Sequence, residues 1–194
     1  MGKTMTWIGV SILFIIFIAF FSSQMITSST KTSLPVVAKL PDFDLVDQYG
    51  QPFKRSDLNG KVTVVAFIFT RCKGPCPVMT AEMTELYKRY EYTDKVQFVS
   101  ITVDPEYDSL AVLKDYAGKQ GVKDHRWKFL TGKISDIASL SEKGFLLPID
   151  VQSQGHSAKF ILVDQDARIR GYYSSGSRDI LEALKTHIEA LVQS

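Results

Sequence analysis

Two continuous runs of apolar, β-branched residues constrain the fold more than any other feature of this chain. The runs are VTVVAFIFT at residues 62–70 and VQFVSITVD at residues 96–104. Neither run alternates between apolar and polar positions in the way that a half-exposed strand does. Each run therefore predicts a strand that is buried on both faces of a sheet.

Helical patterns and hairpins alternate with these two strands. A hairpin with a turn at 49–51 precedes the first strand, and residues 159–173 alternate around an Asp-rich turn that predicts a second hairpin. A helix capped by Asp108 or Ser109 and ended by Gly121 follows the second strand. This order predicts an α/β sandwich with a mixed sheet. Two further helices are indicated by apolar residues at helical spacing, namely Met79, Met83, Leu86 and Tyr90, and then Ile180, Leu181, Leu184, Ile188 and Leu191.

Length, composition and charge exclude several classes of protein. With 194 residues and 45% hydrophobic content, the chain can bury one well-filled core, and residues 41–194 are predicted to form one domain. The 23 basic and 21 acidic residues leave a formal charge of only +2. Nucleic-acid binding needs a basic field that this balance does not supply, so no nucleic-acid partner is expected.

An uncharged apolar segment lies near the N-terminus, at residues 7–26, after a short tail at 1–6. At about 1.5 Å per residue, the segment reaches the roughly 30 Å thickness of a bilayer core, so it predicts a single transmembrane anchor. A cleaved signal peptide is the alternative, although no small-residue cleavage site directly follows the apolar core. Residues 27–40 are predicted to form a polar linker. We expect a protein of the cell membrane with its domain outside the cytoplasm.

Both cysteines of the chain, Cys72 and Cys76, lie in one loop between the first buried strand and a helix. Pro77 suits the first position of a helix, which places Cys76 at or beside the N-cap. The helix N-terminus and the neighbouring Arg71 and Lys73 should lower the pKa of a thiol. We therefore expect an exposed pair of cysteines that lie close together and ionise readily.

Three roles are open to this pair: a structural disulfide, a redox-active dithiol, or two ligands of a metal. A structural disulfide would close only a very short loop and would do little to restrict the unfolded chain. Two thiolates are soft ligands that suit Cu(I) or zinc. The chain also has three histidines. His125 and His187 are expected at the surface, whereas His156 immediately precedes the 159–173 hairpin, where a loop histidine by itself is more often a surface or capping residue than a ligand.

Four motifs in this order resemble the Sco/SenC family of membrane-anchored copper proteins, from about residue 41 to residue 192. The family has a C-x-x-x-C-P motif, a V-D-P-E segment before a helix, and a histidine before a strand and hairpin. Lys73 is one departure, because many members have proline after the first cysteine. The matching stretches here are FTRCKGPCP, ITVDPEYDSLAVLKDYA, WKFLTG and HSAKFILVDQDARIRGYY.

The resemblance implies a thioredoxin-like fold, with a mixed central sheet flanked by helices, and a copper site. The family's copper ligands carry over to Cys72, Cys76 and His156, a set of two sulfurs and one nitrogen that is well matched to Cu(I). The bound copper is expected as Cu(I), Cu(II) or both. Asp104 carries over as the acidic residue of the V-D-P-E segment, where it supports the ligands or caps the turn.

The resemblance also implies a function, which is that of a copper metallochaperone for the dinuclear copper centre of cytochrome c oxidase. The alternative is a membrane-anchored thiol-disulfide oxidoreductase that reduces the copper-ligand cysteines of the oxidase. In that case Cys72 and Cys76 would be its redox-active pair; otherwise the protein is not expected to be an enzyme. The expected partners are the copper-centre subunit of the oxidase, other copper carriers or thiol reductants, and the membrane through the anchor.

Overall fold

The computed structural model describes residue 17 and residues 34–148 and 158–194. The chain divides into two compact units, Met1–Ser33 and Leu34–Ser194, and the second unit contains all the strands described here. The predicted anchor at 7–26 lies outside the described residues except for Phe17. Among the residues that the structure describes, none of the helices has both the length and the apolar character needed to cross a membrane.

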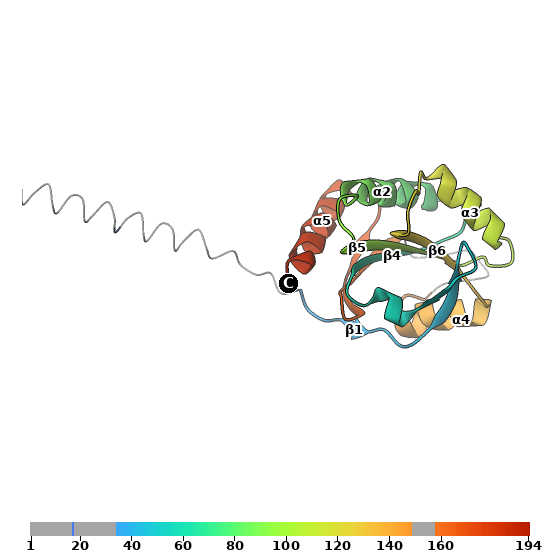
Figure 1. Ribbon diagram of the computed structural model, residues 1–194, viewed down its shortest axis with the longest axis horizontal. Coiled ribbons are helices and arrows are strands. Elements are labelled where there is room, and N and C mark those ends of the chain that lie inside the picture. The colour runs from blue at the N-terminus through green and yellow to red at the C-terminus, as the bar shows by residue number, and fades with distance from the viewer. Residues whose placement is uncertain (1–16, 18–33, 149–157) are drawn as a thin grey trace, which may run out of the picture. The chain divides into compact units, whose positions relative to one another are not determined.

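One mixed sheet forms the centre of the second unit (Figure 1). Its strand order is β1-β8-β7-β4-β5-β6-β2-β3, with β4, β5 and β6 parallel and the remaining pairs antiparallel. The prediction of a mixed sheet is therefore confirmed. The strands are β1 (Ala38–Lys39), β2 (Asp44–Asp47), β3 (Pro52–Lys54), β4 (Val62–Ile68), β5 (Val96–Thr102), β6 (Trp127–Thr131), β7 (Lys159–Val163) and β8 (Arg168–Ser174).

Helices cover both faces of this sheet. Figure 1 shows α2 (Cys76–Arg89), α3 (Leu110–Lys119) and α5 (Arg178–Val192) on one face and α4 (Ile134–Ser139) on the other. A 3-10 turn, η1 (Arg55–Leu58), follows β3, and a π-helical turn, η2 (Leu140–Gly144), continues α4. Ser109 caps α3 by accepting a hydrogen bond from the backbone N–H of Val112. This result decides between the two predicted caps in favour of Ser109.

The two apolar runs form the strands that the sequence predicts. All seven residues of β4 and all seven of β5 are buried, which explains why neither strand alternates in polarity. Both predicted hairpins are also present. The β2–β3 turn uses Gly50 at φ +74°, a backbone conformation that glycine adopts without a steric cost. The β7–β8 turn is held by the buried Asp164, which accepts hydrogen bonds from Asp166 and Arg168.

The end of the predicted linker is folded onto the sheet rather than free of it. Ala38 and Lys39 form β1 and pair with β8, and Leu34 and Leu40 are buried. The Arg170 side chain donates hydrogen bonds to the backbone oxygens of this segment. The composition of residues 34–40 did not indicate a strand, because two residues carry no readable alternation.

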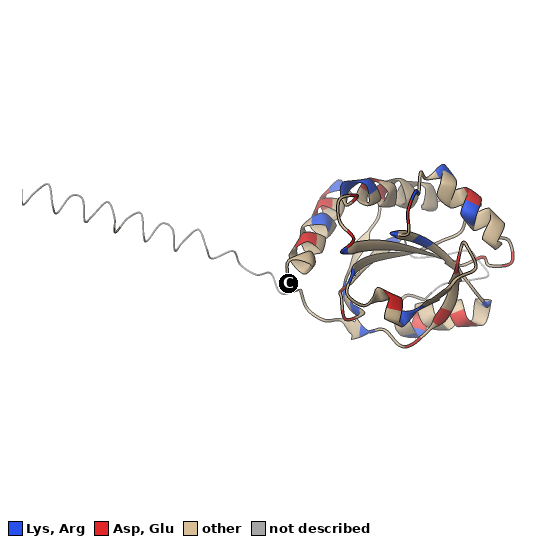
Figure 2. Ribbon diagram, viewed as in Figure 1, with Lys and Arg blue, Asp and Glu red and all other residues tan. Residues whose placement is uncertain are grey.

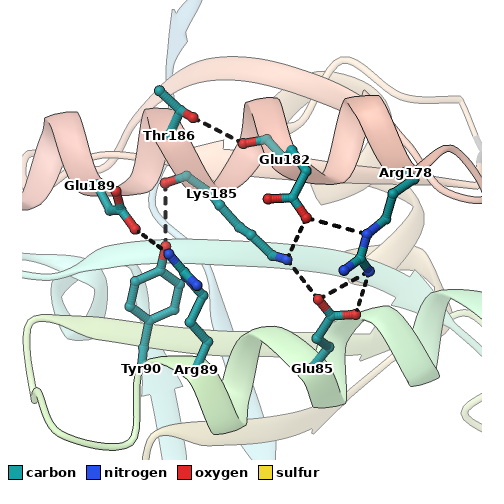
Figure 3. A network of polar contacts seen from close by, with 8 residues as sticks. All are labelled: Glu85, Arg89, Tyr90, Arg178, Glu182, Lys185, Thr186 and Glu189. Carbon is teal, nitrogen blue, oxygen red and sulfur yellow. Dashed lines mark hydrogen bonds and ion pairs between the residues drawn. The ribbon is translucent and has the colours of Figure 1, made fainter.

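A network of opposite charges joins α2 to α5 (Figure 3). The buried Lys185 ammonium lies 2.6 Å from Glu85 and 2.9 Å from Glu182, and Arg178 also contacts Glu85. Figure 2 shows acidic and basic residues in alternation along α5. This network holds α2, whose first residue is Cys76, against the C-terminal helix. The predicted inward residues of α5 are buried, except for the half-buried Ile180.

Candidate functional site

The cysteine loop, residues 69–75, joins the end of β4 to the first residue of α2. Pro75 is the N-cap, so Cys76 is the first residue of the helix and Pro77 the second. The backbone N–H of Cys72 donates to the Phe69 carbonyl at 3.2 Å, and the N–H of Gly74 donates to the Cys72 sulfur at 3.3 Å. These bonds turn the loop back on itself. The N-cap at Pro75 confirms the prediction that Cys76 lies at or beside the cap.

The structure brings Cys72 and Cys76 together as two thiols. A side-chain hydrogen bond joins the two groups, so the prediction that they lie close to each other is confirmed. Two thiols joined by a hydrogen bond have two kinds of chemistry open to them. They can exchange their protons for one soft metal ion, or they can be oxidised to a disulfide.

The prediction that both thiols are exposed and ionise readily is wrong for Cys76. Its side chain is only 1% exposed and belongs to the hydrophobic core, whereas Cys72 is half-buried. Burial raises the pKa of Cys76 to about 12, and the neighbouring Cys72 acts in the same direction. Backbone hydrogen bonds from Phe69 and from Cys76 itself lower the pKa, but they do not offset the burial. The position at a helix start was readable from the sequence, whereas the inward rotation of the side chain was not.

Arg71 contacts Asp104 instead of standing free beside the thiols. Its Nε lies 2.7 Å from the Asp104 Oδ2, and its guanidinium carbon lies 4.8 Å from the centre of the Tyr107 ring. Asp104 also belongs to a turn, because its carbonyl accepts the backbone N–H groups of Tyr107 and Asp108. The structure therefore places Asp104 in a turn and in contact with the residue that precedes Cys72.

Sequence reasoning missed the role of Asp108, which it treated only as a candidate helix cap. The Asp108 side chain is fully buried and accepts a hydrogen bond from the backbone N–H of Thr70 at 3.1 Å. It also accepts from the hydroxyl groups of Thr70 and Thr102. A threonine near the end of each apolar run, with an aspartate six residues after the second threonine, was the signal in the sequence that could have indicated this cluster.

A second polar pair lies one helical turn beyond Cys76. The Thr80 and Tyr116 hydroxyl oxygens are 2.9 Å apart, and this contact links α2 to α3. Burial raises the pKa of the Tyr116 hydroxyl, the bond to Thr80 lowers it, and the two cysteines raise it further. Tyr116 therefore lies within the electrostatic reach of both thiols.

The structure describes two of the three histidines, His125 and His187. His125 is exposed, as predicted. His187 is half-buried and its Nδ1 lies 2.6 Å from the Tyr173 hydroxyl, so the prediction of a simple surface residue is wrong for it. His156 lies outside the described residues. Within the described part of the chain, no three Cys, His, Asp or Glu side chains are grouped so that they could hold a metal.

An open surface pocket of about 190 Å³ lies beside the cysteine loop. Phe69 and Arg71 line it from the loop, and Val103, Asp104 and Pro105 line it from the segment after β5. A second pocket, of about 420 Å³, lies along α3 and includes Thr70, Arg71, Tyr107 and Tyr116. Arg71 lines both pockets, whereas its partner Asp104 lines only the first.

The fold and the site together define a class of protein: a mixed α/β domain with a C-x-x-x-C dithiol where a central strand passes into a helix. The SCO1/SenC family model matches residues 33–193 of this chain. The chain therefore belongs to the SCO1/SenC family. The resemblance that the four motifs indicate is confirmed over the whole of the second unit.

Three solved structures illustrate this similarity. A SCO1/SenC family lipoprotein from Bacillus anthracis is 35% identical, with a TM-score of 0.75, and the match covers 82% of this chain and 98% of that one. BsSco is 28% identical, with a TM-score of 0.72, and the match covers 82% of this chain and 96% of that one. It is described as a member of the Sco family of cytochrome c oxidase assembly proteins and as having a disulfide switch. Copper-bound ScoI from Bradyrhizobium japonicum is 26% identical, with a TM-score of 0.63 and coverage of 77% and 99%.

Proposed function

We propose that this chain is a copper metallochaperone that assists assembly of the dinuclear copper centre of cytochrome c oxidase. The observation that carries the proposal is the pair of adjacent thiols at the start of α2 in a member of the SCO1/SenC family. A relative with 26% identity has been solved with copper bound, and BsSco is described as belonging to a family of oxidase assembly proteins.

Copper is the cargo of this protein in our proposal, and Cys72, Cys76 and His156 are its ligands. Two thiolates supply the soft donors that Cu(I) prefers, and a neutral imidazole supplies the third. Because burial keeps the Cys76 thiol protonated, copper has to replace a proton there, and binding therefore releases protons to the solvent. The half-buried Cys72 is the sulfur that an incoming copper donor reaches first.

The register of the sheet supports the assignment of His156. Strand β7 runs antiparallel to β4, with Phe160 opposite Ala66. The first residue of β7 therefore lies at the end of the sheet at which β4 passes into the cysteine loop. The described chain resumes at Ala158, two residues after His156. Because two residues span at most about 7 Å, this position of Ala158 supports the proposal that His156 is a ligand.

The proposal also includes the type of fold and the membrane anchor. We propose a thioredoxin-like arrangement, because the β4–α2 unit carries the dithiol and the β7–β8 hairpin lies beside β4. We also propose that residues 7–26 anchor the chain in the cell membrane, with the second unit outside the cytoplasm. The uncharged run at 7–26 supports the anchor, and a relative from Bacillus anthracis is described as a lipoprotein.

The second candidate function is a thiol-disulfide oxidoreductase that reduces the copper-ligand cysteines of the oxidase. The contact between the two thiols favours it, because Cys72 and Cys76 can lose two protons and two electrons and form a disulfide. The buried Cys76, with its raised pKa, is a poor attacking group. Cys72 would therefore have to make the attack on the oxidised partner.

The His156→Ala variant separates the two functions. Both need Cys72 and Cys76, but only metal binding needs the imidazole. For a metallochaperone, cells carrying His156→Ala should lose assembled cytochrome c oxidase, although the purified variant still cycles between dithiol and disulfide. His125→Ala is the matched control, because His125 is exposed. Normal oxidase assembly with His156→Ala, together with lost copper binding, would favour the oxidoreductase.

A further inference from the structure

Asp108 is a buried carboxylate that neither proposed function uses. Its side chain has 0% exposure, and carboxylates are almost never fully buried unless they are paired or hydrogen-bonded. Here three donors supply that compensation: the backbone N–H and the hydroxyl of Thr70, and the hydroxyl of Thr102 at 2.5 Å. Burying a carboxylate costs free energy, so we asked what its hydrogen bonds achieve in the local structure.

The three hydrogen bonds join the ends of two parallel strands to the segment before α3. Thr102 is the last residue of β5 and pairs with Ile68, the last residue of β4. Thr70 follows two residues after β4 ends, inside the cysteine loop. Asp108 itself directly precedes Ser109, the cap of α3. The carboxylate therefore fixes the point at which the cysteine loop leaves the sheet.

Thr70 is flanked by two residues that contact the site. Phe69 makes a backbone hydrogen bond to the Cys76 sulfur, and its carbonyl accepts the N–H of Cys72. Arg71, on the other side, contacts Asp104. A displacement of Thr70 would therefore move the backbone groups that hold both cysteines.

We propose that Asp108 is a positioning residue, which holds the cysteine loop through Thr70 so that the Cys72 thiol stays beside Cys76. The carboxylate does not touch the sulfurs and takes no part in their chemistry. It raises the fraction of time in which the two sulfurs are close enough to bond to each other or to share one metal ion. The metal-binding consequence rests on the proposed function, whereas the consequence for the dithiol does not.

The test is the equilibrium of the full chain in detergent with a dithiothreitol buffer, without copper. The protein dithiol transfers two electrons and two protons to oxidised dithiothreitol, which yields the protein disulfide and reduced dithiothreitol. If the loop loosens, the sulfurs meet less often and disulfide formation becomes less favourable. We expect Asp108→Ala to lower the equilibrium constant about tenfold, which corresponds to about 30 mV.

A matched control for this variant is Asp164→Ala. Asp164 is also buried, is also hydrogen-bonded to backbone groups of a turn, and lies in the β7–β8 hairpin. Both variants should lower the melting temperature, but only Asp108→Ala should change the dithiol equilibrium. An unchanged equilibrium in a folded Asp108→Ala protein would show that the carboxylate only stabilises the fold and would overturn the proposal.

If Asp108→Ala does not fold, the Thr70→Val variant tests whether Asp108 positions the cysteine loop. It removes one hydroxyl from the Asp108 cluster and keeps the shape of the side chain. Thr63→Val is its control, because Thr63 lies near the other end of β4 and accepts a hydrogen bond from Gln97. We expect Thr70→Val to lower the equilibrium constant about threefold, in line with the loss of one hydrogen bond, and Thr63→Val to leave it unchanged. Equal constants for these two variants would overturn the proposal.

Discussion

The Arg71 Nε lies 2.7 Å from the Asp104 Oδ2, so a residue adjacent to Cys72 is joined to the turn that follows β5. The two side chains differ in exposure, at 49% for Arg71 and 17% for Asp104. An ion pair of this exposure contributes little to global stability. Its effect should therefore be found in the cysteine loop rather than in the free energy of unfolding.

Asp104→Asn tests the local effect of this ion pair. We expect the free energy of unfolding to change by less than about 1 kcal/mol, because the pair is partly exposed to solvent. The rate at which iodoacetamide alkylates Cys72 should rise, because the loop loses one of its contacts. The matched control is Asp115→Asn, which removes the exposed pair with Lys119 on α3. Identical alkylation rates in the two variants would contradict this account of Asp104.

The order of alkylation should follow the burial of the two thiols. Cys72 is half-buried and Cys76 is 1% exposed with a pKa of about 12, so a reagent in solution meets a protonated, covered sulfur at Cys76. Under reducing, metal-free conditions at pH 8, peptide mass spectrometry should find label on Cys72 well before Cys76. Labelling of Cys76 first, or of both at equal rates, would argue against the buried position.

The raised pKa of Cys76 also makes the stability depend on alkaline pH. The ordinary value is 9.0 and the folded value is about 12, so between these limits the folded state holds a proton that the unfolded state has released. The free energy of unfolding should then fall as pH rises through this window, by about 1.4 kcal/mol per pH unit. Below pH 9 the contribution is fully present.

The measurement is urea unfolding of the reduced full chain at pH 8, 9 and 10, set against Cys76→Ala. The variant is the necessary reference because tyrosines titrate in the same range, and burial raises the pKa of Tyr173 to about 12 as well. The difference in unfolding free energy between the wild type and the variant should shrink from pH 9 to pH 10. A difference that stays constant from pH 9 to pH 10 would contradict the raised pKa of Cys76.

The network between α2 and α5 gives a prediction about stability alone. Burial acts to lower the pKa of Lys185, but its hydrogen bonds to Glu85 and Glu182 raise it, so the ammonium stays charged. Glu85→Ala removes the nearer of these two carboxylates and should cost about 1.5 kcal/mol, because Glu182 still pairs with the ammonium and Glu85 is 40% exposed. Lys185→Met replaces the charge with an apolar chain of similar length and should cost less than about 1 kcal/mol.

Chemical denaturation of both variants measures these costs, and the dithiol equilibrium provides the control. Neither side chain touches the cysteine loop, so both variants should keep the equilibrium constant of the wild type. A greater loss of stability in Lys185→Met than in Glu85→Ala would contradict the assignment of a buried, compensated charge.

Sequence periodicity predicted the central strands, both hairpins and the long helices, because each of these elements carries its own pattern of apolar residues. The burial of Cys76 was not predictable in this way. The first residue of a helix can face solvent or the core, and only the packing of α2 on the sheet decides between the two. The charges near Cys72 were equally visible in the sequence, but the sequence does not say that Arg71 contacts Asp104.

Asp108 illustrates a second limit of prediction from sequence. The residue stands next to the true cap, Ser109, and both residue types favour that position. Thr102 lies only six positions before Asp108, but the contact with Thr70, 38 positions away, depends on the parallel pairing of β4 with β5. His156 remains a prediction, because it lies outside the described residues.

The most direct test of the central claim is an anaerobic Cu(I) titration of the reduced full chain in detergent, followed by X-ray absorption at the copper edge. The account predicts one copper per chain, bound by two sulfurs and one nitrogen. Cys72→Ser or Cys76→Ser should abolish tight binding, and His156→Ala should remove the nitrogen and leave both sulfurs. Copper bound without sulfur, or a nitrogen ligand that persists in His156→Ala, would contradict the proposed site.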